Sequence, residues 1–278
     1  MTDHVLRRAA LVLGIAVLLV FGSSEARADG IQVFERNTNA DLSFFTYDNL
    51  PDMVTGWGAA NGHDSANGVW STAWSLAGVS YDGTQYIQAF EKDANADLSI
   101  FTYATYEDMV TGWSAASGHH TAIGVWDPDW SMVGVAFDGS QYIQVFERNT
   151  NADLSFFTYD SFGDMVTGWS ARSGHYAANG VWSTSWSMAG VGFDGSQYVQ
   201  VFESNANADL SFFTYNTLAD MVTGWSAASG HDTSIGVWSN DWSMTGVAFD
   251  PIPEPSTAIL LSAACAAIAL FRRHRSSR

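Results

Sequence analysis

The chain has 278 residues, of which 47% are hydrophobic, so it is long enough to bury a sizeable core. Acidic residues outnumber basic ones by 29 to 11, which makes nucleic acid and anionic lipid unfavourable partners. The single cysteine, Cys265, lies near the C-terminus, so disulfides do not hold the rest of the chain together.

The N-terminus has the parts of a secretory signal peptide. Two arginines precede an apolar run at residues 9–21, and small residues follow at Ala26 and Ala28. This order predicts a signal peptide at residues 1–28, with cleavage after Ala28. The residues around the arginines do not fit a twin-arginine signal, so the general secretory route is expected.

Residues 29–252 form a predicted body with an internal repeat of 56 residues. The stretch IQVFERNTNADLSFFTYD at Ile31 returns unchanged at Ile143, and diverged copies begin at Ile87 and Val199. The four units are 31–86, 87–142, 143–198 and 199–250. This body contains four basic and 26 acidic residues, so its net charge is near −22.

Each unit is expected to form four short β-strands separated by Gly, Asn and Asp. One consecutive set of these strands, which begins in the second unit and ends in the third, is Trp130–Asp138, Tyr142–Arg148, Leu154–Asp160 and Met165–Ala171. Apolar side chains point to both faces of the middle strands, which is typical of a sheet enclosed between neighbouring sheets. Four such units predict an all-β fold, a four-bladed β-propeller.

The phase of the repeat predicts a closed ring. The body begins with a second strand at Ile31, with no first strand before it, and ends with a surplus first strand, Trp242–Asp250, which can complete the first blade. The first strands are rich in Gly, Ala and Val, as expected beside a crowded central axis. The alternative is a linear array of β-repeats, which would need distinct capping ends.

The turn between the second and third strands is expected to share a face of the ring with the long crossover to the next unit. Two copies of this turn have the alternate spacing of calcium ligands: Asn37, Asn39 and Asp41, and Asp93, Asn95 and Asp97. However, Leu42 stands where a calcium loop has Gly, and no carboxylate closes the loop. A tight hairpin turn is therefore the preferred interpretation, with calcium as the alternative and no other cofactor expected.

One histidine per unit follows a glycine: His63, His119, His175 and His231. Four imidazoles that pointed to the axis could bind a metal. Their expected position in the crossover makes exposed loop histidines the preferred interpretation.

Two tryptophans per unit flank the crossover and are candidates for stacking on sugar rings, with the histidines beside them. These candidates are Trp70, Trp74, Trp126, Trp130, Trp182, Trp186, Trp238 and Trp242. The alternative for each tryptophan is packing between blades, because the indole buries a large area.

The body resembles sugar-binding propeller lectins, including fucose-binding ones. The resemblance lies in Ile143-Gln144-Val145-Phe146, a polar turn, Phe156-Phe157-Thr158-Tyr159, and then Gly168-Trp169. It implies a propeller fold and carbohydrate binding. Fucose binders typically carry a sugar-bonding Arg at the second position, whereas this chain has Gln32, Gln88, Gln144 and Gln200. That departure argues against fucose, though not against other sugars.

Four equal units suit multivalent binding better than catalysis, because catalytic sites are usually singular. No nucleophile elbow, zinc-protease helix or phosphate loop is present, so we expect a non-enzyme. The expected function is multivalent binding of matrix carbohydrate. A structural surface protein is the first alternative, and a glycan-processing enzyme with a carboxylate pair is the second.

The C-terminus has three parts in a fixed order: Pro253-Glu254-Pro255, an apolar run from Ala258 to Phe271, and an arginine cluster. Residues 253–278 thus resemble the PEP-CTERM sorting signal. The resemblance implies recognition by an exosortase-type enzyme in a Gram-negative bacterium that makes exopolysaccharide. The apolar run would first anchor the protein in the inner membrane, before transfer to the cell surface or extracellular matrix.

Overall fold

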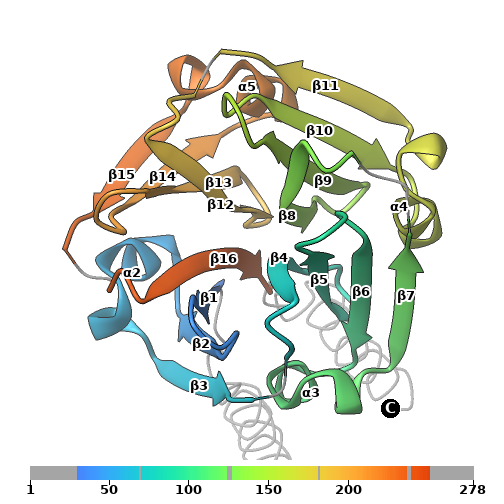
Figure 1. Cartoon of the computed structure of the whole chain (residues 1–278). Helices are drawn as coiled ribbons and strands as arrows, with labels where there is room; N and C mark the ends of the chain where they lie inside the picture. Colours follow the sequence, from blue (N-terminus) through green and yellow to red (C-terminus); the bar gives the residue numbers. More distant parts are fainter. Residues whose placement is uncertain (1–29, 69, 124–126, 181, 237–238, 251–278) are drawn as a thin grey trace, which may run out of the picture.

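The computed structural model describes residues 30–68, 70–123, 127–180, 182–236 and 239–250, which form four antiparallel sheets around one axis (Figure 1). Each sheet has four strands and is one blade, so the chain is a four-bladed β-propeller, as predicted. The predicted signal peptide, sorting motif and apolar C-terminal run lie outside the described residues. Within these residues, no helix has the length and apolar character needed to cross a membrane.

The strands of blade 1, from the axis outward, are β16 (Trp242–Phe249), β1 (Gly30–Arg36), β2 (Leu42–Tyr47) and β3 (Gly62–Ala66). Blade 2 contains β4 (Trp74–Tyr81), β5 (Tyr86–Lys92), β6 (Leu98–Tyr103) and β7 (Gly118–Ala122). Blade 3 contains β8 (Trp130–Phe137), β9 (Tyr142–Arg148), β10 (Leu154–Tyr159) and β11 (Gly174–Ala178). Blade 4 contains β12 (Trp186–Phe193), β13 (Tyr198–Ser204), β14 (Leu210–Tyr215) and β15 (Gly230–Ser234).

The ring is closed by its last strand. β16 pairs with β1 along its whole length, from Gly30 opposite Phe249 to Arg36 opposite Trp242. The predicted closure of the first blade is therefore confirmed, and β1 is not left as an edge strand.

The inner strands approach one another closely because they carry glycine at the crowded positions. A Cβ atom on Gly78 would lie 2.8 Å from the backbone nitrogen of Val135, and one on Gly134 would lie 2.7 Å from Val191 Cγ1. Gly190 and Gly246 face the next valines around the ring in the same way. The expectation of small residues at the axis is confirmed.

The expected fourth strand is wrong. In the third unit, Met165–Ala171 belongs to helix α4 (Phe162–Thr167) and to the 3-10 helix η3 (Trp169–Ala171), and the outermost strand is β11. The Ser161 hydroxyl accepts a hydrogen bond from the backbone N–H of Asp164, which caps the helix, and Met165 is buried beneath it. Capping and this one buried anchor outweigh the strand preference of Val166 and Thr167.

The other units repeat this helix pair between their third and fourth strands. The helices are α2 (Leu50–Thr55) and η1 (Trp57–Ala59), α3 (Tyr106–Thr111) and η2 (Trp113–Ala115), and α5 (Leu218–Thr223) and η4 (Trp225–Ala227). Figure 1 shows α2, α3, α4 and α5 at the outer corners of the ring.

The strand registers define two faces of the ring. The helix face carries the helices together with the inner hairpins at residues 82–85, 138–141 and 194–197, because Tyr86 pairs with both Tyr81 and Tyr103. The crossover face carries the turns at residues 37–41, 93–97, 149–153 and 205–209 and the connections from each outermost strand to the next blade. The predicted sharing of a face by turn and crossover is therefore confirmed.

Glutamates link each blade to the next on the crossover face. The Glu147 carboxylate accepts a hydrogen bond from the backbone N–H of Met188, which lies beside a β-bulge in the inner strand of blade 4. The equivalent hydrogen bond occurs at the other three seams, where Glu35, Glu91 and Glu203 accept from the backbone N–H of Leu76, Met132 and Met244, respectively. The four links therefore run around the ring.

Tyrosines link the blades on the helix face. The hydroxyl of Tyr142 donates to Asp82, that of Tyr198 to Asp138, and that of Tyr86 to Asp250. Blade 1 has Gly30 at the position of these tyrosines, so the seam between blades 4 and 1 lacks this link.

Candidate functional site

The polar turns hold the crossover loops in place. In blade 1, Asp41 Oδ1 accepts a hydrogen bond of 2.7 Å from the backbone N–H of Gly68, and Asn39 Nδ2 donates to Asp41 Oδ2. Asp153 and Asp209 hold Gly180 and Gly236 in the same way. The residue with positive φ in this turn is Ala40, at 55°, although Asn and Asp adopt this backbone more readily than alanine.

The remaining calcium candidates also make internal hydrogen bonds. Asn37 bonds to the crossover through the carbonyl of Asn240 and to the hydroxyl of Ser243. Asp93 accepts from Ser75, and Asn95 donates to Asp97. In the part of the chain that the structure describes, no three His, Cys, Asp or Glu residues gather as a metal site. The turns thus have a demonstrated structural role.

The four histidines lie in the outermost strands, not in the crossovers as expected. His63 stacks on Phe45, with ring centroids 4.4 Å apart, and its Nε2 lies 3.3 Å from Ser43 Oγ. His119, His175 and His231 repeat this stack on Phe101, Phe157 and Phe213. Each imidazole is exposed on one face, far from the axis, so the four rings do not converge on a common metal.

Two of the crossover tryptophans complete an aromatic row between blades. Trp70 stacks on Phe90 of blade 2 at 3.9 Å and meets Phe101 edge-on at 5.4 Å, and Phe101 stacks on His119. The same row in blade 4 consists of Trp182, Phe202, Phe213 and His231. The structure therefore brings predicted tryptophan and histidine candidates into one row. Both indoles are partly buried and pack against the next blade, as the alternative of packing between blades predicted.

The tryptophans that begin the inner strands are also partly buried. Trp74 and Lys92, Trp130 and Arg148, and Trp242 and Arg36 pair across the two strands, each with the cation 5.9 Å from the ring centroid. Trp186 faces Ser204 instead. Trp126 and Trp238 lie outside the described residues.

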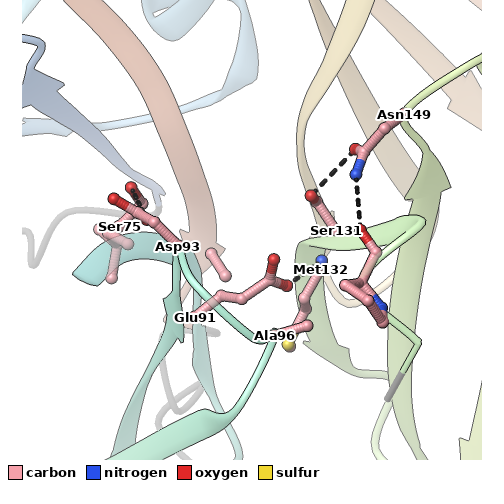
Figure 2. Close-up of a pocket in the computed structure, with 10 residues that line it drawn as sticks. Ser75, Glu91, Asp93, Ala96, Ser131, Met132 and Asn149 are labelled. Atoms are coloured by element: carbon pink, nitrogen blue, oxygen red, sulfur yellow. Dashed lines mark hydrogen bonds between the residues drawn. The ribbon is translucent and has the colours of Figure 1, made fainter. Parts of the chain in front are cut away.

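Two clefts lie at the blade seams on the crossover face. One, of about 290 Å³, is lined by Glu91, Asp93, Ser131 and Asn149, and Figure 2 shows Glu91 reaching across it to the Met132 backbone. The other, of about 330 Å³, contains Glu35 and shares Asp93 with the first.

Burial raises the pKa of all four seam glutamates to about 7, although the hydrogen bond from the backbone N–H acts in the opposite direction. The Asp93 carboxylate adds to the rise for Glu35 and Glu91.

The glutamines that replace the arginine of fucose lectins do not reach the surface. Gln32, Gln88, Gln144 and Gln200 are fully buried, and their side-chain amides have no hydrogen-bond partner among the described residues. They lie between blades and are not available to a sugar.

A different set of tryptophans is the most exposed. Trp57, Trp113, Trp169 and Trp225 have 60%, 59%, 49% and 60% of their surface exposed, all at the start of the 3-10 helices on the helix face. The sequence pattern predicts a strand that contains the Gly-Trp pair, and these four tryptophans are not among the predicted site residues.

The Gly-Trp pair has a local structural cause. The helix before it ends at a glycine with φ near 90°, Gly112 in blade 2, whose N–H bonds to the Asp108 carbonyl. Only glycine adopts this backbone readily, and it turns the next residue, Trp113, out of the helix into solvent. The signal that could have revealed this is the Thr-x-x-Asp cap at Thr105 and Asp108, which begins eight residues before the tryptophan.

Comparisons with known proteins show no sequence relatives: no family model matches, and no curated protein sequence matches. Among solved structures, a chain of a nidogen/laminin complex is similar, with 8% identity and a TM-score of 0.33. The match covers 80% of this chain and 99% of that chain. The class of the protein, a four-bladed β-propeller, therefore rests on its own sheet topology.

Proposed function

We propose that this protein is an exported, multivalent carbohydrate-binding propeller of an extracellular polysaccharide matrix. The observation that carries the proposal is the ring of four exposed tryptophans on the helix face: Trp57, Trp113, Trp169 and Trp225. An indole presents a flat apolar surface on which the apolar face of a sugar ring can stack. Four copies on one rigid ring allow a polymer to engage several weak sites at once.

Export supports the choice of ligand. The predicted signal peptide and the PEP-CTERM-like terminus direct the protein out of the cell, with an exosortase-type enzyme as the sorting partner. The body, near −22 in charge, is a poor binder of nucleic acid and anionic lipid, and polysaccharide is the abundant polymer of that compartment.

Binding of the full-length protein to a glycan array, with and without calcium, tests the proposal. We expect binding to one polysaccharide class, lost when the four tryptophans are changed to leucine together. As a matched control, Ile123→Ser and Ile235→Ser remove two apolar side chains that are 71% and 70% exposed on the crossover face, and should leave binding unchanged.

Three results would contradict the proposal. Absence of binding to every glycan would leave a structural surface protein as the explanation. Binding that survives the four leucine changes but is lost in Trp74→Leu or Trp130→Leu variants would place the site on the crossover face. Turnover of the bound glycan would indicate an enzyme, with the clefts at Glu35, Glu91 and Asp93 as the place to test.

A further inference from the structure

One of the four exposed tryptophans already holds a cation. In blade 3 the guanidinium of Arg172 lies over the ring of Trp169, with Cζ 5.3 Å from the centroid. Its Nη1 also donates a hydrogen bond of 2.5 Å to the Trp169 carbonyl oxygen. The indole face and this carbonyl together form a small cation-binding surface.

The same backbone occurs in blades 2 and 4 without the arginine. Ala116 and Ala228 occupy the position of Arg172, with φ and ψ of −62° and 134°, and −61° and 136°, against −59° and 141° for Arg172. Trp113 and Trp225 are therefore presented in the same way, but 59% and 60% exposed instead of 49%.

The carbonyl can accept a second donor. The Trp113 and Trp225 carbonyls each accept one hydrogen bond, from the N–H of Ala116 and Ala228 at 3.3 Å. The Trp169 carbonyl accepts the equivalent bond from the Arg172 N–H at 3.4 Å and also receives the guanidinium. Since a carbonyl oxygen has two lone pairs, an external donor can take the second one in blades 2 and 4.

We propose that Trp113 and Trp225 bind protonated amino groups, and that the polysaccharide recognised by the helix face is an amino-sugar polymer with free, unacetylated amines. This inference rests on the proposed carbohydrate binding and names its ligand class. The ammonium takes the place that the Arg172 guanidinium has on Trp169. The strongly acidic body favours a cationic polymer over a neutral one, and Glu107 and Asp108 lie in the short helix that precedes Trp113.

Calorimetric titration of the full-length protein with two matched oligomers tests the inference. The probes are a glucosamine hexamer, below neutral pH where its amines are protonated, and the N-acetylglucosamine hexamer of the same linkage. We expect the glucosamine hexamer to bind roughly tenfold more tightly. The double change Trp113→Leu and Trp225→Leu should reduce that difference several-fold.

Arginine substitutions separate the tryptophan site from general attraction to an acidic protein. Ala116→Arg should cover Trp113 as Arg172 covers Trp169 and weaken binding of the glucosamine hexamer several-fold. Ile123→Arg adds the same charge on the crossover face and should have little effect. Arg172→Ala should uncover Trp169 and strengthen binding.

Two outcomes would overturn the inference, and they differ in what they leave standing. Equal, tryptophan-dependent binding of both hexamers would retain carbohydrate binding and reject amine recognition. Binding of the glucosamine hexamer that is indifferent to Trp113, Trp225, Ala116 and Arg172 would show attraction by net charge alone. Ala116 is partly buried, but Arg172 occupies the same position in blade 3, and the other changed side chains are exposed. Each variant should therefore keep the melting temperature of the parent, which serves as the folding control.

Discussion

At the scale of single residues, the seam glutamates are the most unusual groups of the ring. Each is an acid taken out of water, and each accepts a hydrogen bond from a backbone N–H of the next blade. Burial is the larger influence on the pKa of each carboxyl, which it raises from the ordinary value of 4.5 to about 7. Between pH 4.5 and about 7, the folded protein therefore keeps protons on these glutamates that the unfolded chain has released.

This difference predicts a pH dependence of stability. A raised pKa in the folded state gives stability that is fully present below pH 4.5 and is lost as the pH rises through about 7. We expect the melting temperature to be about 5–10 °C higher at pH 5 than at pH 8.

A quadruple Glu→Gln variant at Glu35, Glu91, Glu147 and Glu203 separates this effect from the loss of general charge repulsion. Its amide oxygens can still accept the four N–H donors but do not titrate. We expect a clearly shallower pH dependence, followed by calorimetry. An unchanged slope would show that the seam carboxylates do not cause it.

At the scale of elements, the short helices present the exposed tryptophans. A helix of six residues is marginal alone, so its cap and its buried methionine must hold it. In blade 3 these are Ser161 and Met165.

Two opposite substitutions in α4 test this view. Ser161→Ala removes the capping oxygen and should lower the free energy of unfolding by about 1 kcal/mol. Gly163→Ala, where the added Cβ has only the Ser161 oxygen at 3.8 Å, should raise it by about 0.5–1 kcal/mol. Chemical denaturation measures both, and destabilisation by Gly163→Ala would show that α4 is not held as a regular helix.

Most of the secondary-structure elements could be predicted from the sequence. The 56-residue period, the closing strand and the first three strands of each blade could be predicted, because they are apolar, β-branched and bounded by turns. The fourth could not, because the outermost strand, such as Gly174–Ala178, faces solvent and contains few apolar residues. The preceding segment, Met165–Ala171, contains Val, Thr and Trp and is the more strand-like pattern. The capping residue of helix α4 is a weaker signal than this composition.

Side-chain exposure was harder still to predict. Trp70 and Trp113 both lie close to a glycine in the sequence. Yet Trp70 packs on Phe90, whereas the side chain of Trp113 is 59% exposed. What separates them is which blade covers each indole, a property of the assembled ring and not of any local pattern.

At the scale of the whole molecule, closure by β16 makes the four blades interdependent. Each inner strand packs against its neighbours around the axis, and each glutamate link needs the next blade in place. Deletion of Trp242–Asp250 should therefore abolish cooperative unfolding of all four blades, because it removes the inner strand of blade 1 and the acceptor of Tyr86. Circular dichroism and thermal denaturation measure this, and three blades that still melt in one transition would contradict it.

The closing strand also brings the two ends of the described body together. Gly30 and Phe249 are paired neighbours, and both lie at the helix-face end of blade 1. Any tether attached through either end therefore leaves from the side that carries Trp57, Trp113, Trp169 and Trp225. A protein attached through its C-terminal end would therefore orient these four tryptophans toward the surface to which it is attached. Under the carbohydrate binding proposed above, a bound polymer would then lie between the propeller and that surface.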